Sequence, residues 1–154
     1  MFMKKIVVIG GGVSGLIAAI HAKNKNNRVI ILERNNTCGK KILVTGNGRC
    51  NYSNSNQDIN HYHSSSSDNL ESIINQGNIS AFLDFYKSIG IIPKVKNGYY
   101  YPYSNQAVTV QQALLRKVNE LDIDVKTNTY VDDIALNGNS FKVKTNNGII
   151  DADI

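Results

Sequence analysis

The chain has 154 residues, of which 42% are hydrophobic and 19% charged, and its formal net charge is +5. This composition is typical of a globular protein and excludes a wholly disordered, collagen-like or coiled-coil chain. The length suits one ordinary domain. Lysine and arginine are spread along the sequence, whereas nucleic-acid-binding proteins usually gather them on one face, so we expect no nucleic-acid partner.

Membrane, disulfide and metal sites are also disfavoured by the sequence. The apolar run near the N-terminus is interrupted at Gly10–Gly12 and is shorter than the roughly 18 residues that a membrane-spanning helix needs. Cys38 and Cys50 lack CxxC spacing, and with His61 and His63 they do not form a zinc-ligand pattern. We therefore expect a reduced, cytoplasmic protein with no metal and no membrane partner.

Residues 1–33 predict a β-α-β unit. Residues 4–9 and 28–33 are apolar, β-branched runs typical of strands that are buried on both faces. Residues 16–23 lie between them and predict a helix rich in small side chains. Two strands joined in this way pair in parallel.

Residues 35–67 show no periodicity and are rich in Asn, Ser and Gly. Long loops are usually functional or disordered, so we interpret the part up to Asn51 as a working loop and residues 54–67 as a linker. Two helices are expected next, at 68–76 and 78–89, and Asn78 is a plausible N-cap of the second.

The remaining elements follow in the order hairpin 93–103, helix 107–121, strand 123–126 and a three-stranded meander at 130–136, 141–145 and 149–154. Asn97-Gly98 predicts the hairpin turn, and Asn137-Gly138 and Asn147-Gly148 predict the two turns of the meander. Because the chain ends inside an apolar strand pattern at Asp153-Ile154, we expect a fragment.

The motif Gly10-x-Gly12-x-x-Gly15 stands between the first strand and the first helix, and Glu33 ends the second strand. In such a motif the first glycine permits a tight turn, the second lets a pyrophosphate approach the backbone, and the third lets the helix pack closely on the strand. The N-terminus of the helix attracts phosphate. Glu33 is suited to both hydroxyls of an adenosine ribose and would repel a 2′-phosphate. The motif predicts an adenine dinucleotide, FAD or NAD.

Residues 38–51 favour FAD. They form a second glycine-rich and basic loop directly after the acidic residue, where an NAD-dependent dehydrogenase would normally enter another helix and strand. The loop combines glycines for close approach with cations for phosphate: Gly39, Gly46, Gly48, Lys40, Lys41 and Arg49.

Four segments together carry a resemblance to a known family. They are VIGGGVSGLIAAI (8–20), ILER (31–34), GKKILVTGNGRCN (39–51) and YYPYSNQAVTVQQAL (100–114). The chain resembles the N-terminal part of bacterial NAD(P)/FAD-dependent oxidoreductases with a glutathione-reductase-type Rossmann fold. These include aminoacetone-oxidase-like and bile-acid-reductase-like flavoproteins.

The resemblance implies a Rossmann-like α/β fold that binds FAD, with a parallel sheet, helices on one face and the antiparallel meander on the other. It implies that residues 46–51 lie near the pyrophosphate and flavin and that the backbone near Val131 contacts the adenine. The residues and the resemblance together predict these cofactor-binding positions: Gly10, Gly12, Val13, Ser14, Gly15, Glu33, Arg34, Lys40, Lys41, Gly46, Gly48, Arg49, Cys50, Asn51 and Val131.

For function, we expect the FAD-binding part of a flavin-dependent oxidoreductase that passes hydride between NAD(P)H and a small-molecule substrate. Residues 1–154 would be the N-terminal portion of the FAD domain, with the rest of that domain and the substrate domain outside this chain. No catalytic residue is identified. The alternatives are an NAD-binding dehydrogenase domain, which would bind NAD without flavin, and a non-catalytic nucleotide-binding fragment.

Overall fold

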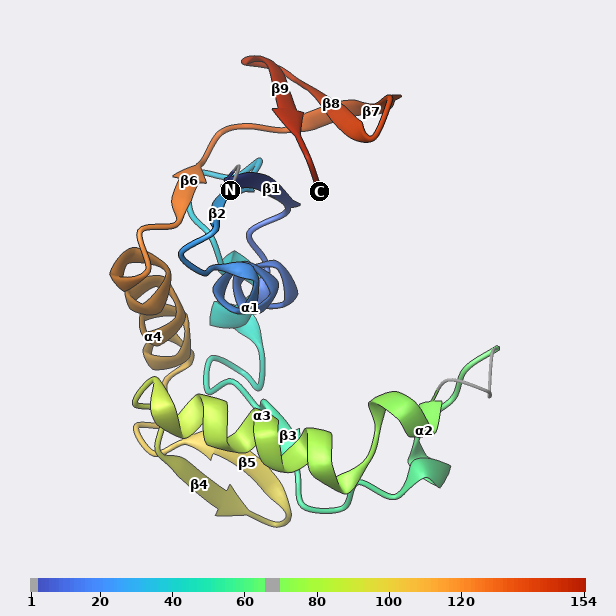
Figure 1. Cartoon of the computed structure of the whole chain (residues 1–154). Coiled ribbons are helices and arrows are strands. Elements are labelled where there is room, and N and C mark those ends of the chain that lie inside the picture. The colour runs from blue at the N-terminus through green and yellow to red at the C-terminus, as the bar shows by residue number, and fades with distance from the viewer. Residues whose placement is uncertain (1–2, 66–69) are drawn as a thin grey trace. The chain divides into compact units, whose positions relative to one another are not determined.

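A computed structural model describes residues 3–65 and 70–154 (Figure 1). The chain forms two compact units, one of residues 1–43 and 114–154 and the other of residues 44–113. The second boundary between the units falls inside helix α4, Ala107–Glu120. Each unit is described by itself.

The first unit contains a parallel sheet in the order β1-β2-β6. Its strands are β1 (Lys4–Ile9), β2 (Asn27–Leu32) and β6 (Asp124–Lys126), and helix α1 (Val13–Ala22) joins the first two. Both neighbouring pairs are parallel, which confirms the β-α-β unit. The helix begins three residues earlier than predicted because Gly12 is its N-cap, so the helix follows the glycine turn at once.

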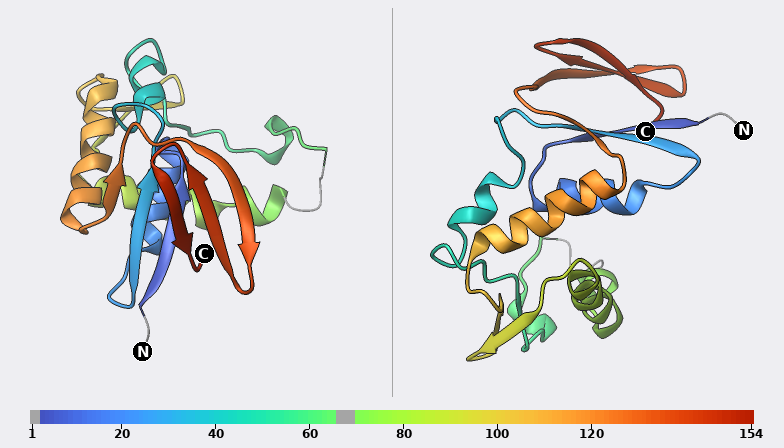
Figure 2. Two further views of the ribbon diagram at one scale, coloured as in Figure 1. Left: turned by 90° about the horizontal axis from the view of Figure 1, so that it is seen from above. Right: turned by 90° about the vertical axis from the view of Figure 1, so that its left-hand side faces the viewer.

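Strand β2 is buried on both faces, as its unbroken apolar run predicted. Ile30 and Leu32 pack in one cluster with Val143 and Ala152 of the meander. Val29 and Ile31 are fully buried and alternate with them, so they point to the opposite face of the sheet, where α1 lies (Figure 2). The expected fold class, a Rossmann-like α/β sheet between a helical layer and an antiparallel meander, is therefore confirmed.

The meander consists of β7 (Val131–Asn137), β8 (Ser140–Thr145) and β9 (Gly148–Ala152), paired antiparallel in this order. Its two turns are each displaced by one residue from the predicted positions. Asn137 pairs with Ser140, so the first turn is Gly138-Asn139 and not Asn137-Gly138. Gly138 has φ +64, which suits the first central position of a type II′ turn.

The second turn of the meander lies one residue earlier than predicted. Thr145 pairs with Gly148, so the turn is Asn146-Asn147 and not Asn147-Gly148. The Thr145 hydroxyl donates to the Gly148 carbonyl at 2.7 Å and accepts from the Asn147 amide at 3.1 Å. The side chain at the end of β8 therefore holds this turn, a contribution that the glycine pattern does not reveal.

The last predicted strand is shorter than expected, since β9 ends at Ala152. Asp153 and Ile154 leave the meander and lie along the outer edge of β1. The amide of Asp153 donates to the Lys5 carbonyl at 2.8 Å, and the amide of Val7 donates to the Ile154 carbonyl at 2.9 Å. An edge strand offers unpaired backbone groups, and these two residues pair with them.

The second unit contains the antiparallel sheet β3-β5-β4. Its strands are β3 (Ser53–Asn54), β4 (Pro93–Lys96) and β5 (Tyr99–Pro102). Asn97 and Gly98 have φ of +52 and +83, the two positive values that a type I′ turn requires, so the predicted hairpin is confirmed. The stretch predicted as a linker, residues 54–67, contains Asn54 of β3 and the 3₁₀ helix η2 (Ile59–His61), and its residues 66–67 lie outside the described residues.

Of three further helices, two were predicted with other bounds and one lies in the stretch predicted as a working loop. The structure has η1 (Lys40–Val44, a 3₁₀ helix), α2 (Leu70–Ile73) and α3 (Gln76–Ser88). The predicted N-cap Asn78 is wrong, because the Asn75 side chain accepts from the Asn78 amide and is itself the cap. Asp68 and Asn69 of the predicted helix 68–76 lie outside the described residues.

Aromatic side chains pack together in the second unit. The ring of Tyr52 lies 4.9 Å from that of Tyr86 and 6.2 Å from those of Phe82 and Tyr100, measured between centroids. Burial, and next the neighbouring Tyr100 and Cys50, raise the pKa of Tyr52 to about 12. Tyr100 thus serves packing, as expected for a hairpin, whereas Tyr103 is exposed.

Candidate functional site

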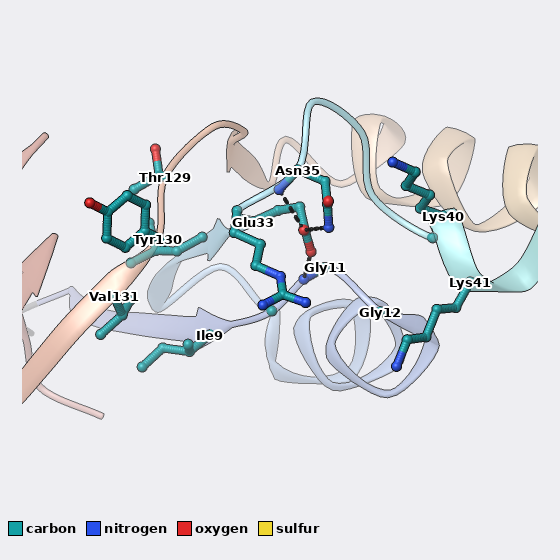
Figure 3. A pocket seen from close by; sticks show the side chains of 14 residues that line it. Ile9, Gly11, Gly12, Glu33, Asn35, Lys40, Lys41, Thr129, Tyr130 and Val131 are labelled. Atoms are coloured by element: carbon teal, nitrogen blue, oxygen red, sulfur yellow. Dashed lines mark hydrogen bonds between the residues drawn. The ribbon is translucent and has the colours of Figure 1, made fainter. Parts of the chain in front are cut away.

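An open pocket of about 750 Å³ lies in the first unit, next to the C-terminal ends of β1 and β2 (Figure 3). Four segments line it, namely residues 9–12, 32–35, 39–41 and 129–131. Ligands of open α/β sheets bind outside the C-terminal ends of the strands, so the pocket is at the expected edge.

Each glycine of the predicted motif has a separate structural reason. Gly10 has φ +97, which disfavours any other residue. A Cβ on Gly15 would lie 1.9 Å from the carbonyl oxygen of Gly10, so the helix packs directly against the turn. A Cβ on Gly12 would meet no described atom within 4 Å. Gly12 lines the pocket, so a ligand can approach its backbone closely.

The N-terminus of α1 follows this glycine turn. Its N-cap is Gly12, which has no side chain to bond the first amides of the helix, and no acidic residue lies in the first turn. The first N–H groups of a helix have no partner within it and carry partial positive charge. The arrangement suits a negatively charged group such as a phosphate.

Glu33 follows β2 and is held by three hydrogen bonds. Its Oε2 accepts from the Gly11 amide at 2.7 Å, and its Oε1 accepts from the backbone amide and the side-chain Nδ2 of Asn35 at 2.8 and 2.6 Å (Figure 3). Its side chain is buried, and burial by itself raises the pKa of Glu33. The hydrogen bonds from Asn35 and Gly11 outweigh burial, so the pKa lies below its ordinary value and the carboxylate is ionised.

Of the described residues that line the pocket, three carry a positive charge and one a carboxylate. The cations are Arg34, Lys40 and Lys41, and the carboxylate is Glu33. A ligand therefore fits the site if it has a negative charge at one end and hydroxyl groups that can donate hydrogen bonds to Glu33. Tyr130, half exposed, and Val131 add aromatic and apolar surface for a flat ring.

The structure brings about half of the predicted binding residues together. Those that line the pocket are Gly10, Gly12, Glu33, Arg34, Lys40, Lys41 and Val131. Val13, Ser14 and Gly15 form the first turn of α1. The others lie in the second unit, and their expected proximity to a cofactor stays a prediction: Gly46, Gly48, Arg49, Cys50 and Asn51.

Sequence reasoning missed Gly11, Asn35 and Tyr130, which also line the pocket. Gly11 occupies a variable position of the glycine motif, yet a Cβ there would lie 2.3 Å from the sulfur of Cys38. The run of three glycines was the available signal. For Asn35, the signal was an amide two residues after the acidic residue, a spacing at which Asn often bonds the local backbone. Tyr130 had no signal beyond its position next to Val131.

Cys38 is buried behind Gly11, and its pKa is raised by burial and next by the charge of Glu33. The amide of Gly39 donates to the Gly11 carbonyl at 2.7 Å. Cys38 and Gly39 thus support the glycine turn from behind. The structure has both cysteines as free thiols.

The loop 45–51 of the second unit is closed by its own backbone. The Cys50 amide donates to the Thr45 carbonyl at 2.9 Å, and both the amide and Nε of Arg49 donate to the Gly46 carbonyl. Asn47 and Cys50 have φ of +55 and +57, and Asn tolerates this conformation better than most residues. Arg49 lies over the ring of Tyr101 at 5.4 Å.

Comparison with known proteins identifies the family. The HI0933-like protein Rossmann domain matches residues 4–154. The chain belongs to this family. It is a family of FAD-binding oxidoreductases, so the resemblance found in the sequence is confirmed.

Two curated relatives and one solved structure show how far the likeness extends. The chain is 35% identical over 153 residues to a 3-dehydro-bile acid delta(4,6)-reductase of Clostridium scindens, covering 98% of this chain and 37% of the relative. It is 35% identical over 48 residues to the ribosomal RNA dihydrouridine synthase of Escherichia coli K12, covering 31% of this chain and 12% of the relative. The chain therefore spans little more than a third of the first relative's length.

The solved structure is the open conformation of a flavocytochrome c3 fumarate reductase. It is similar with a TM-score of 0.64 at 16% identity, covering 97% of this chain and 32% of that one. At this identity the likeness concerns the fold alone, and it agrees with the Rossmann-like architecture described above.

Within residues 3–65 and 70–154, no helix is long and apolar enough to cross a membrane. The same residues contain no group of three or more His, Cys, Asp and Glu side chains arranged to hold a metal ion. The cytoplasmic location, and the lack of metal and membrane partners, stay predictions.

Proposed function

We propose that residues 1–154 form the N-terminal portion of the FAD-binding domain of a flavin-dependent oxidoreductase, which passes hydride between NAD(P)H and a small-molecule substrate. The pocket of the first unit would receive the adenosine and pyrophosphate of FAD. The rest of the FAD domain and the substrate domain would belong to the longer protein, as the 37% coverage of the bile-acid reductase supports.

One observation carries this proposal. The glycine turn and the ionised carboxylate of Glu33 face the same pocket, and a hydrogen bond of 2.7 Å from Gly11 to Glu33 joins them. Phosphate and ribose are adjacent in a dinucleotide, so their binding groups must also be adjacent. The open space beside Gly12 and the N-terminus of α1 suit the pyrophosphate.

The described residues fit an adenine dinucleotide in their chemistry. Gly12 and the first amides of α1 would hold the pyrophosphate, with Lys40 and Lys41 as counter-charges, and Glu33 would accept from the ribose. Arg34 and Val131 would border the adenine. Flavin, when bound, supplies the two-electron chemistry, while these residues bind and orient the nucleotide.

The names of the two curated relatives bear on the substrate class. The Clostridium scindens relative is named as a bile-acid reductase and shares nearly all of this chain. The Escherichia coli relative is named for ribosomal RNA but shares only 31% of this chain. The spread of positive charge along the sequence favours a small molecule over RNA.

The visible absorbance spectrum tests the proposed cofactor. The purified chain is incubated with FAD, desalted and scanned, and a parallel sample is incubated with NAD. Retained flavin bands would support the proposal, whereas tight NAD binding without flavin would support a dehydrogenase domain. If this chain and a chain extended beyond Ile154 both remain colourless, the proposal is wrong.

A further inference from the structure

The carboxylate of Glu33 has fewer free hydrogen-bond acceptor positions than its place in the motif suggests. A carboxylate offers about four acceptor positions. Three are filled, one by Gly11 on Oε2 and two by Asn35 on Oε1. About one position therefore remains, on Oε2, for a ligand.

An adenosine ribose presents two neighbouring hydroxyl groups, so Glu33 needs a second acceptor beside it. Asn35 lines the same pocket. Its Nδ2 donates to Glu33 Oε1, and no donor to its Oδ1 is found among the described residues. The amide oxygen of Asn35 is therefore the free acceptor next to the carboxylate.

The backbone holds Asn35 in place on both sides. Its own amide donates to Glu33 Oε1 at 2.8 Å, and its carbonyl accepts from the Asn128 amide at 3.0 Å. The Glu33 carbonyl accepts from the Thr129 amide at 2.9 Å. The backbones of Glu33 and Asn35 are thus anchored to the same neighbouring segment, residues 128–129.

We propose that Asn35 is a second ribose-binding and specificity-determining residue: Glu33 accepts from one hydroxyl through Oε2, and Asn35 accepts from the other through Oδ1. The inference rests on the proposed function, and it replaces the expectation that Glu33 accepts from both hydroxyls. Two adjacent acceptors, one of them charged, also disfavour a ribose that carries a 2′-phosphate.

The test measures binding of ADP, 2′-deoxy-ADP and 3′-deoxy-ADP by calorimetry, to the unaltered chain and to Asn35→Ala. On the unaltered chain, each deoxy ligand should bind about tenfold more weakly than ADP, as expected for one lost hydrogen bond. Asn35→Ala should bind ADP about tenfold more weakly. In this variant, the deoxy ligand that lacks the hydroxyl group assigned to Asn35 should bind as tightly as ADP. Asn36→Ala is the matched control, since this exposed neighbour does not line the pocket.

Two outcomes would overturn the inference. Equal weakening of all three ligands by Asn35→Ala would show that Asn35 only supports Glu33. If either deoxy ligand binds the unaltered chain as tightly as ADP, there is no second acceptor, and this second measurement does not depend on the folding of any variant. If the unaltered chain retains FAD but the effect of Asn35→Ala does not depend on which ribose hydroxyl group is present, only the inference fails. If neither the unaltered chain nor a chain extended beyond Ile154 binds FAD or ADP, the proposed function fails as well.

Discussion

The two glycine-rich loops of this chain, residues 10–15 and 45–51, use their glycines differently. In the first loop Gly12 lines a pocket and leaves the first amides of a helix without side-chain caps. In the second loop the backbone groups bond one another, and the Gly48 carbonyl accepts from the Ala107 amide at 2.8 Å. The glycines therefore border an open pocket in the first loop and allow the chain to close on itself in the second.

This difference shows what a glycine motif by itself can and cannot report. Glycine is required wherever φ is positive or atoms approach closely, whether the approaching atom belongs to a ligand or to the chain. Gly46 illustrates the second case, because a Cβ there would lie 2.7 Å from the Asn51 amide nitrogen. The flanking elements, and not the glycines, distinguish the two cases.

The largest expected effect is on stability in the first loop. Gly15→Ala places a Cβ 1.9 Å from the Gly10 carbonyl, and we expect a loss of about 3 kcal/mol in the free energy of unfolding. Urea denaturation measures it. Gly12→Ala is the control, with an expected loss within about 1 kcal/mol but weaker FAD binding. Equal losses of stability in the two variants would contradict the assigned roles.

The next effect is on binding. Glu33→Gln removes the negative charge of the carboxylate that we propose accepts from the ribose, so affinity for FAD or ADP should fall by about tenfold to a hundredfold. Fluorescence titration measures the change, and Asp151→Asn, which alters an exposed carboxylate on β9, should bind as the unaltered chain does. Unchanged affinity in Glu33→Gln would remove this residue from the site.

A smaller effect on stability is expected in the second loop. Gly46→Ala forces a side chain onto a residue with φ +53 and against the Asn51 amide, which should cost about 1–2 kcal/mol in unfolding free energy. Asn47→Gly changes the adjacent residue, which has φ +55, and should stay within about 0.5 kcal/mol. Neither substitution should change the affinity for ADP if the loop serves chain closure. A variant that binds ADP more weakly but is as stable as the unaltered chain would show that the loop 45–51 belongs to the site.

The smallest effect concerns acid stability. The pKa of Glu33 is below its ordinary value of 4.5 in the folded chain, because the hydrogen bonds from Asn35 and Gly11 outweigh burial. Its contribution to stability is therefore complete above pH 4.5 and is lost as the pH falls further, through the folded-state pKa. Thermal unfolding between pH 7 and about pH 3 should show a smaller acid-induced loss in Glu33→Gln than in the unaltered chain. If the unfolding temperature depends on pH identically in Glu33→Gln and in the unaltered chain, the assigned hydrogen bonds are contradicted.

The sequence predicted most elements because their signals are local. The apolar run 4–9, the helix after Gly12 and the Asn97-Gly98 turn each depend on the conformation and burial of neighbouring residues. The glycine motif and Glu33 were found for the same reason, since their spacing follows from one β-α-β unit.

The errors occurred where individual hydrogen-bond partners, near or distant in the sequence, decide the structure. The meander turns moved by one residue because the cross-strand pairing selects which residues form the turn. The N-cap moved to Asn75 because its side chain reaches the Asn78 amide. Asp153 and Ile154 pair with β1 because this edge strand, near the N-terminus of the chain, has backbone groups free to bond them.

By itself, the sequence determined the β-α-β unit, the meander and the acidic residue expected at the ribose, since periodicity and motif spacing act over short stretches of chain. The family followed from the resemblance of four segments to known flavoproteins. Only the tertiary structure decided that the Gly11 amide joins the donors of Asn35 at Glu33. The amide of Gly11 and both donors of Asn35 meet at Glu33 because the glycine turn and the end of β2 converge at one edge of the sheet. The bond from Gly11 depends on this convergence in space, because Gly11 lies 22 residues from Glu33 in the sequence, whereas Asn35 lies beside the carboxylate in the same stretch of chain.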